Sequence, residues 1–432
     1  MPHPAALGRL FLGLVLSSAC LALAGLPALA QGDRPFTAAD IEAAQYDGGD
    51  IPSGRSALTA KVQILLDRSG TSPGVIDGFK GAMSQSAIMA FERRAGLPMD
   101  GLLDAHVWNL LQAWAERPAT QSYTITAADA EGLVDHIPTD YAEKAQMPSM
   151  GYTSIAERLA ERFHMDEKFI QFLNPGVTLA PGATIQVMAP NARIRGEVTR
   201  IIIDKDSRRV AGYNARGEML VDYPATIGSS ATPSPAGTHS VRTVAINPNY
   251  TYNPEVNFQQ GDNDRKLVIP PGPNGPVGTV WIGLTKPTYG IHGTPTPSQL
   301  FHNQSMGCVR LTNWDAEELA GMVRIGATSV EFLASGVTIA DVTGGARAAS
   351  APVAEIALPD AAPAAAAVPA TETPLALPDA TAPAATAPAA DVVEDTTEPE
   401  LAPAGESDLL GEALSGALPE GFVVPLPAET QP

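Results

Sequence analysis

Cysteine is scarce in this chain, which contains only Cys20 and Cys308 among its 432 residues. Two thiols cannot form a disulfide framework, and so few thiols with scattered histidines make a poor zinc site, so we expect no metal and no cofactor. Runs of Lys and Arg are absent too, so binding to nucleic acid or to an anionic membrane surface is not expected. The sequence also lacks S-x-x-K and H-E-x-x-H motifs, which disfavours serine penicillin-binding enzymes and zinc metallo-amidases.

Negative charge is concentrated at the C-terminal end. The net charge is −20 at pH 7, and residues 334–432 hold 15 acidic residues against one basic residue, Arg347. This segment consists largely of Ala, Pro, Thr, Asp and Glu, which bury too little apolar surface to offset chain entropy. We therefore expect residues 334–432 to be a disordered, Ala/Pro-rich acidic tail. The rest of the chain is long enough for two or more domains.

The first 30 residues have the pattern of a secretory signal peptide. Arg9 precedes an apolar run over residues 10–26, and Ala28-Leu29-Ala30 then provides an A-x-A cleavage site. One alternative is a membrane anchor, for which the run is short. Another is a lipoprotein signal at Cys20, which would need an aliphatic residue where Ser17 stands. We predict export and cleavage after Ala30.

Cleavage at this position would leave Cys308 as the only thiol of the exported protein. An unpaired thiol in an oxidising compartment is a liability unless the protein uses it. The alternative is a buried, inert cysteine, but Cys308 is surrounded by Gly307, Arg310 and Asn313 instead of an apolar run. Cys308 is therefore our candidate nucleophile.

A catalytic thiol needs a base nearby and N–H groups that stabilise the oxyanion. His292 is our candidate base, because it lies 16 residues upstream of Cys308 and a strand, loop and return strand can bring the two together. His302 and His239 are less favoured rivals. The main-chain N–H groups of Met306, Gly307 and Cys308 are predicted to converge on the oxyanion.

Residues 56–116 are predicted to form a small three-helix domain, with an apolar stripe from Leu58 to Leu66 in the first helix. The segment resembles the peptidoglycan-binding domain often attached to bacterial wall enzymes. The shared positions are mostly turn and core residues, and they are Gly74-x-x-Asp77-Gly78, Phe91, Gly96-Leu97-Pro98, Asp100-Gly101 and Trp108. Asp77 and Asp100 are interpreted as loop-capping residues instead of catalytic acids. Residues 32–55 are predicted to be a mobile leader.

Residues 122–190 read as a strand, two short helices and a strand. This order resembles a degenerate LysM module, which binds glycan, although residues 127–150 form a long insert that such modules lack. A structural spacer is the alternative. His136 and His164 are interpreted as surface residues.

Residues 197–333 are predicted to form a mainly β domain, a sandwich or barrel with one short helix near Cys308. The strands are expected from β-rich segments and turn signals, and the helix is expected to pack Trp314 and Leu319 inward. We expect strands over residues 198–203, 210–213, 219–225, 238–245, 280–284 and 328–332, and a helix over residues 315–323. The segment from residue 247 to residue 276 is too long for a plain connection and is predicted to be a lid or binding surface.

This third unit resembles the YkuD-type L,D-transpeptidase catalytic domain. The likeness rests on His292-Gly293-Thr294, a spacer, and Ser305-Met306-Gly307-Cys308-Val309-Arg310. Many family members have histidine where this chain has Met306, and a thioether cannot act as a base. The resemblance implies that Ser305 and Arg310 orient the loop or the substrate and that Tyr289 borders the acceptor side. Gly293 and Thr294 are further substrate-orienting candidates.

The resemblance further implies a periplasmic, wall-associated cysteine acyltransferase that forms 3-3 peptidoglycan cross-links through a thioester on a stem tetrapeptide. Its partners would be the stem peptides and the glycan. If water resolves the thioester, the enzyme is an L,D-carboxypeptidase or endopeptidase instead. If a protein lysine resolves it, the enzyme attaches an outer-membrane protein to peptidoglycan. A non-enzymatic wall-binding scaffold is the remaining alternative.

Overall fold

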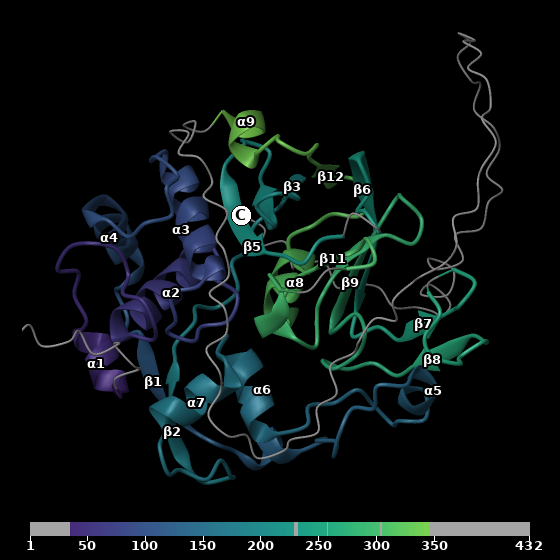
Figure 1. Cartoon of the computed structure of the whole chain (residues 1–432), viewed down its shortest axis with the longest axis horizontal. Coiled ribbons are helices and arrows are strands. Elements are labelled where there is room, and N and C mark those ends of the chain that lie inside the picture. Colours follow the sequence, from purple (N-terminus) through teal and green to yellow (C-terminus); the bar gives the residue numbers. More distant parts are fainter. Residues whose placement is uncertain (1–34, 229–231, 257, 303–304, 345–432) are drawn as a thin grey trace, which may run out of the picture.

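The computed structural model describes residues 35–228, 232–256, 258–302 and 305–344 (Figure 1). The predicted signal peptide and residues 345–432 of the predicted tail lie outside the described residues. In the described ranges, no helix is both long enough and apolar enough to cross a membrane.

The N-terminal part contains most of the helices. In chain order its main elements are α1 (Ala38–Ala43), α2 (Ala57–Ser69), α3 (Ala82–Ala95), α4 (Ala105–Leu111), β1 (Thr120–Thr124), α5 (Tyr141–Lys144), α6 (Ile155–Arg162), α7 (Glu167–Leu173) and β2 (Thr184–Met188). Helices α2, α3 and α4 confirm the predicted three-helix unit. The first of them starts where the Ser56 hydroxyl accepts the Thr59 N–H and ends at Gly70, which adopts a left-handed conformation.

Strands β1 and β2 pair in antiparallel fashion, with α6 and α7 between them in sequence, in the predicted strand–helix–helix–strand order. One hydrophobic core joins this unit to the three helices, because Ile64 and Leu65 of α2 share it with Leu159, Phe169 and Val187. A unit of about sixty residues buries little apolar surface alone, and a core shared by two units increases the apolar surface that each of them buries. The two predicted domains therefore pack as one body.

The predicted mobile leader is partly folded, which corrects that prediction for residues 38–43. Helix α1 places Ile41 in the core at 0 % exposure. The Lys61 ammonium donates to the carbonyls of Glu42 and Ala44, and the Glu42 carboxylate accepts the N–H of Thr120 at 2.7 Å. Such a short helix has no stability of its own, so its order depends on these contacts, which local sequence does not reveal.

The C-terminal part is built on one curled eight-stranded sheet. Its strands are β3 (Arg200–Asp204), β4 (Arg209–Tyr213), β5 (Met219–Pro224), β6 (Gly237–Ile246), β9 (Val280–Leu284), β10 (Gly290–His292), β11 (Val309–Arg310) and β12 (Ser329–Phe332), in the spatial order β11-β10-β9-β6-β12-β3-β4-β5. The long strand β6 pairs with β12 through its first half and with β9 through its second, and the register shifts between Val241 and Thr243. This irregularity bends the sheet, as β-bulges do.

The mainly β prediction is confirmed, with two corrections. The predicted helix is α8 (Asn313–Ala320), but a second short helix, α9 (Ile339–Thr343), packs beside β3 and buries Ile339. The folded part thus extends beyond residue 333, the boundary set by composition. The long segment after β6 contains a small antiparallel pair, β7 (Tyr250–Tyr252) and β8 (Leu267–Ile269), which were not predicted because three residues show no readable period.

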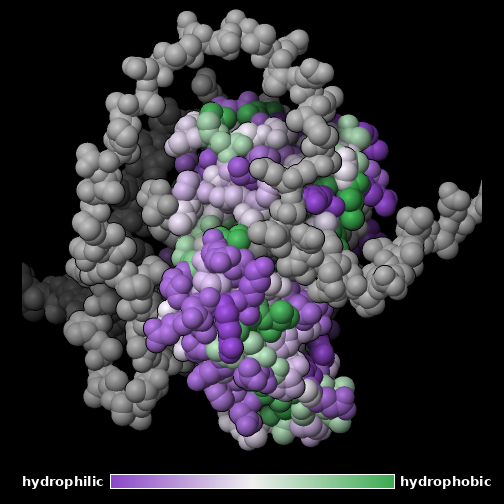
Figure 2. All heavy atoms as spheres, turned by 90° about the vertical axis from the view of Figure 1, so that its right-hand side faces the viewer, coloured by the Kyte–Doolittle hydropathy of each residue, from purple (hydrophilic) through white to green (hydrophobic). Residues whose placement is uncertain are grey.

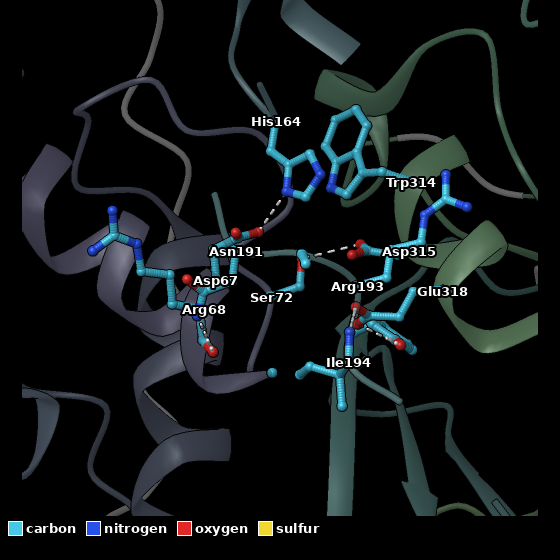
Figure 3. A pocket seen from close by; sticks show the side chains of 13 residues that line it. Asp67, Arg68, Ser72, His164, Asn191, Arg193, Ile194, Trp314, Asp315 and Glu318 are labelled. Carbon is cyan, nitrogen blue, oxygen red and sulfur yellow. Dashed lines mark hydrogen bonds and ion pairs between the residues drawn. The ribbon is translucent and has the colours of Figure 1, made fainter. Parts of the chain in front are cut away.

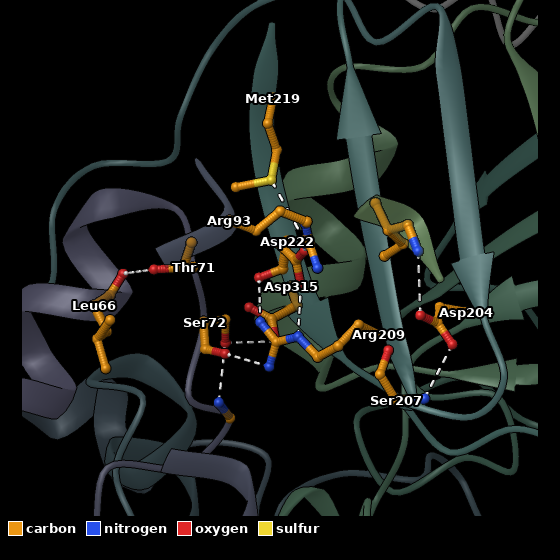
Figure 4. Close-up of polar contacts among 12 residues, drawn as sticks. Leu66, Thr71, Ser72, Arg93, Asp204, Ser207, Arg209, Met219, Asp222 and Asp315 are labelled. Atoms are coloured by element: carbon orange, nitrogen blue, oxygen red, sulfur yellow. Dashed lines mark hydrogen bonds and ion pairs between the residues drawn. The ribbon is translucent and has the colours of Figure 1, made fainter. Parts of the chain in front are cut away.

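The two parts are joined at strand β5, the edge of the large sheet. The Asp222 N–H donates to the Gly70 carbonyl at 2.7 Å, and the Ser72 N–H donates to the Asp222 carbonyl at 2.9 Å. Residues 70–72 therefore extend the sheet and cover an edge that would otherwise be open. Figure 4 shows the ionic centre of this junction, where the buried Asp222 carboxylate pairs with Arg209 of β4 and Arg93 of α3.

A pocket beside this junction contains His164, which corrects the prediction that His164 is a surface residue (Figure 3). The ring stacks on Trp314 with centroids 5.1 Å apart, and Nδ1 lies 2.9 Å from Asp67 Oδ1. Burial disfavours the charged imidazole, but the carboxylates of Asp67, Asp315 and Glu318 together outweigh this effect, so the pKa of His164 is raised. His136, by contrast, is exposed as predicted.

Candidate active site

The fold brings His292 and Cys308 onto neighbouring strands. Strands β10 and β11 are parallel, and the register pairs Ile291 with Val309 and His292 with Arg310. Extending this register by one residue places Cys308 opposite Gly290. Because side chains alternate along a strand, His292, Arg310 and Cys308 share one face of the sheet. Ile291 and Val309 point to the other face, into the core.

His292 is held as a neutral base. Its Nδ1 lies 2.7 Å from the Gly293 carbonyl oxygen, and since a carbonyl can only accept, Nδ1 carries the proton. The lone pair of Nε2 is then left to accept a second proton. The ring is 4 % exposed and stacks on Trp281, with centroids 5.6 Å apart. Burial, reinforced by the charge of Arg310, lowers the pKa of His292 to about 3.

Cys308 rests as a thiol. The side chain packs against a small cluster of Ala245, Val277 and Trp281, and Sγ lies 3.6 Å from the Thr288 carbonyl oxygen. Burial raises the pKa of the Cys308 thiol, while the main chain of Gly290 and the guanidinium of Arg310 oppose the shift. The resting site therefore holds a neutral thiol and a neutral imidazole on one face of the sheet, and the nucleophile must be generated by proton transfer.

Hydroxyl groups from two segments hold the loop before Cys308. Ser305 Oγ donates to the Cys308 carbonyl and accepts the Gly307 N–H at 3.1 Å. Thr232 Oγ1 donates to the Ser305 carbonyl at 2.9 Å, and Ser234 Oγ donates to the Gly307 carbonyl at 2.7 Å. Sequence reasoning missed Thr232 and Ser234, since only a turn signal at Pro233 marks their segment.

The predicted oxyanion donors need one correction. The Gly307 N–H is directed at Ser305 Oγ and is not available to a substrate. The N–H groups of Met306 and Cys308 donate to no other residue in the described ranges. The main-chain N–H groups of Met306 and Cys308 therefore remain for an oxyanion. Ser305 stabilises the loop by accepting the third N–H, that of Gly307.

Gly307 cannot carry a side chain without moving the loop. Its φ is +109°, and a Cβ would lie 2.7 Å from Tyr289 Cε1 and 3.2 Å from the Pro233 carbonyl oxygen. We expect Gly307→Ala to lower kcat/KM by about 100-fold, because small displacements of a nucleophile are costly. Gly217→Ala is the matched control, since Gly217 has φ +76° with nothing within 4 Å. Steady-state kinetics check this, and equal activity of both variants would contradict the account.

Other predicted site residues are structural. A Cβ on Gly293 would lie 2.1 Å from Asn313 Oδ1. Asn313 in turn accepts the Thr279 N–H and donates to Glu161 Oε1 at 2.7 Å, which joins α8 to α6. Thr294 is buried and bonds locally, its Oγ1 accepting the Thr296 N–H at 3.3 Å. These contacts place Gly293 and Thr294 in the framework around His292.

The two other candidate bases, His239 and His302, lie on other segments of the catalytic part of the chain. His239 is on β6, where Nε2 lies 3.2 Å from the Ala236 carbonyl oxygen and the ring packs on Phe332. His302 is exposed on the segment between β10 and β11. In the described part of the chain, no group of three or more His, Cys, Asp or Glu residues could hold a metal ion.

Two parts of the chain match family models of known proteins. Residues 198–332 match the family model described as "L,D-transpeptidase catalytic domain", and residues 55–111 match a model of a peptidoglycan-binding domain. The chain is 29% identical over 169 residues to the protein named "Putative L,D-transpeptidase YkuD" of Bacillus licheniformis, covering 39% of this chain and 87% of that protein. The Bacillus subtilis protein of the same name is 33% identical over 105 residues, covering 24% of this chain and 49% of that protein.

Among solved structures, an L,D-transpeptidase from Mycobacterium smegmatis is similar with 20% identity and a TM-score of 0.26. The similarity covers 35% of this chain and 64% of that one.

Proposed function

We propose that this chain is a cross-linking enzyme in which Cys308 is the nucleophile, because residues 198–332 match the model of an L,D-transpeptidase catalytic domain and residues 55–111 match that of a peptidoglycan-binding domain. The substrate is a donor stem tetrapeptide, and the scissile bond joins its third and fourth residues. The observation that carries the proposal is the pairing of β10 with β11, which places Cys308 and His292 on the same face of the sheet. The proton of the neutral His292 ring is on Nδ1, so Nε2 can accept another.

In the first half-reaction, the Cys308 proton passes to His292 Nε2 and Sγ bonds to the scissile carbonyl carbon. The resulting oxyanion accepts hydrogen bonds from the N–H groups of Met306 and Cys308. When the intermediate collapses, the C–N bond breaks, His292 returns the proton to the departing amine, and D-alanine leaves. A thioester on Cys308 remains.

In the second half-reaction, a side-chain amine of a neighbouring stem attacks the thioester. His292 takes a proton from that amine, the C–S bond breaks, and the thiol of Cys308 is restored while a 3-3 cross-link forms. His292 is neutral before each step and can accept a proton each time, although its low pKa makes the charged imidazolium costly to form.

The same thioester permits other acceptors. Water would yield a tripeptide, as in an L,D-carboxypeptidase or endopeptidase, and a lysine of an outer-membrane protein would tether that protein to the wall. We favour the stem amine, because the attached peptidoglycan-binding domain would keep neighbouring stems at high local concentration. We favour an enzyme over a wall-binding scaffold because Cys308 and a neutral His292 are both intact on one face of the sheet. We propose that residues 1–30 direct the enzyme to the periplasm.

The test is product analysis. Purified protein lacking residues 1–30 is incubated with a disaccharide tetrapeptide, and the products are separated and weighed by mass spectrometry. Cross-linked dimers with released D-alanine are expected. Tripeptide with no dimer would assign the hydrolase instead. Unchanged substrate would leave the scaffold, or an enzyme whose acceptor is a protein lysine that the assay lacks.

A further inference from the structure

The insert of residues 127–150 is docked on the catalytic domain. The Tyr141 N–H donates to Gln260 Oε1 at 3.1 Å, and the Asn263 amide donates to Asp140 Oδ2 at 2.9 Å. At the other end of the insert, the Met150 N–H donates to the Pro271 carbonyl at 2.9 Å. All these partners belong to the long segment between β6 and β9. Figure 1 shows α5 beside β7 and β8, and Figure 2 shows this side of the molecule as largely hydrophilic.

Tyr141 links the insert to the thiol through aromatic contacts. Its ring meets Tyr250, Tyr252 and Phe258 edge to face, at centroid distances of 6.0, 5.2 and 5.9 Å. Tyr250 packs against the same small cluster as Cys308. Tyr252 uses its hydroxyl within the segment, accepting the Gln260 N–H at 2.9 Å, whereas the hydroxyls of Tyr141 and Tyr250 bond to no residue in the described ranges.

Arg310 supplies a positive charge near Cys308, Tyr141 and Tyr250. It lies on the Cys308 face of β11, two residues beyond Cys308, which is about 6 to 7 Å along a strand. Within the described part of the chain, its guanidinium forms no hydrogen bond or ion pair. Burial raises the pKa of Tyr141 to about 12 and Arg310 opposes that shift, which agrees with a guanidinium close to the phenol.

The proposed substrate brings one carboxylate close to the sulfur. The donor tetrapeptide ends one residue beyond the attacked carbonyl, so its terminal carboxylate lies about 4 Å from the carbon that Cys308 attacks. An arginine and phenol hydroxyls are suitable donors for a carboxylate. We propose that Arg310, Tyr250 and Tyr141 bind the terminal carboxylate of the donor peptide, with Tyr141 contributed by the insert of the preceding unit. This inference rests on the proposed function for the identity of the ligand.

The test measures binding, so it does not depend on turnover. In a Cys308→Ala background, which leaves the peptide intact, calorimetry compares a tetrapeptide that has a free C-terminal carboxylate with its C-terminal carboxamide. The protein with Tyr141 should prefer the carboxylate, and Tyr141→Phe, which keeps the ring contacts, should weaken carboxylate binding about tenfold and carboxamide binding less than about twofold. Gln146→Ala, an exposed residue just after the same helix, is the control and should change neither affinity.

Equal losses for the two peptides, no effect of Tyr141→Phe, or no preference for the carboxylate would each overturn the proposed site. The two proposals also fail separately. If the binding difference is found but the enzyme with Cys308 forms no product, the carboxylate site stands and the cross-linking function falls. If dimers form but the preference is independent of Tyr141, the function stands and this site falls.

Discussion

Cys308→Ala is expected to remove cross-linking activity, lowering the rate by at least about 1,000-fold. Cys308 is the one free thiol in the described part of the chain, and the bonds that hold its loop come from Ser305, Thr232 and Ser234 and do not involve the sulfur. The variant should therefore fold normally. Dimer formation from the disaccharide tetrapeptide, followed by chromatography, measures the loss.

His292→Ala should lower the rate almost as far, since a nucleophile and its base act as one unit. His302→Ala is the matched control, because His302 is exposed on the connecting segment, and it should retain activity within about twofold of the original protein. Loss of activity in His302→Ala with retention in His292→Ala would reverse the assignment of the base.

Asp222→Ala is expected to lower the free energy of unfolding by about 3 to 5 kcal/mol. Asp222 is fully buried and pairs with two arginines, Arg209 within the sheet and Arg93 from α3. Removing the carboxylate leaves both guanidinium groups buried without their anion. Urea unfolding followed by tryptophan fluorescence measures the change.

The control for this stability prediction is Glu116→Ala, which removes an exposed carboxylate and should change the free energy of unfolding by less than about 0.5 kcal/mol. A loss below about 1 kcal/mol in Asp222→Ala would show that the junction contributes little. Burial and the neighbouring Arg93 lower the pKa of Arg209, which shows the cost of burying this charge that the ion pair with Asp222 offsets.

Cys308 could be proposed as the nucleophile from sequence because the evidence for it is local. Cysteine scarcity, the glycine before Cys308 and the motif around His292 are all readable in a single chain. The longer strands could also be predicted from local sequence, and β9 was predicted with its observed limits. A continuous apolar run of five residues bounded by turn signals is typical of a fully buried strand.

What could not be predicted depends on contacts between distant residues. Arg93 and Asp222 are 129 positions apart, and the Asp67 that raises the pKa of His164 is 97 positions away. No periodic pattern marks such a pair, so His164 was misread as a surface residue. The insert at residues 127–150 was predicted as a departure from the LysM pattern. Its docking depends on Gln260 and Asn263, and the sequence around these two residues predicts only a long loop.

The central claim is that Cys308 carries the acyl group, and intact-protein mass spectrometry tests it most directly. After brief incubation with the disaccharide tetrapeptide and acid quenching, the protein should gain the mass of the donor minus D-alanine, on a peptide containing Cys308. Cys308→Ala should gain nothing. The same adduct on Cys308→Ala, or cross-linked product formed by that variant, would contradict the account.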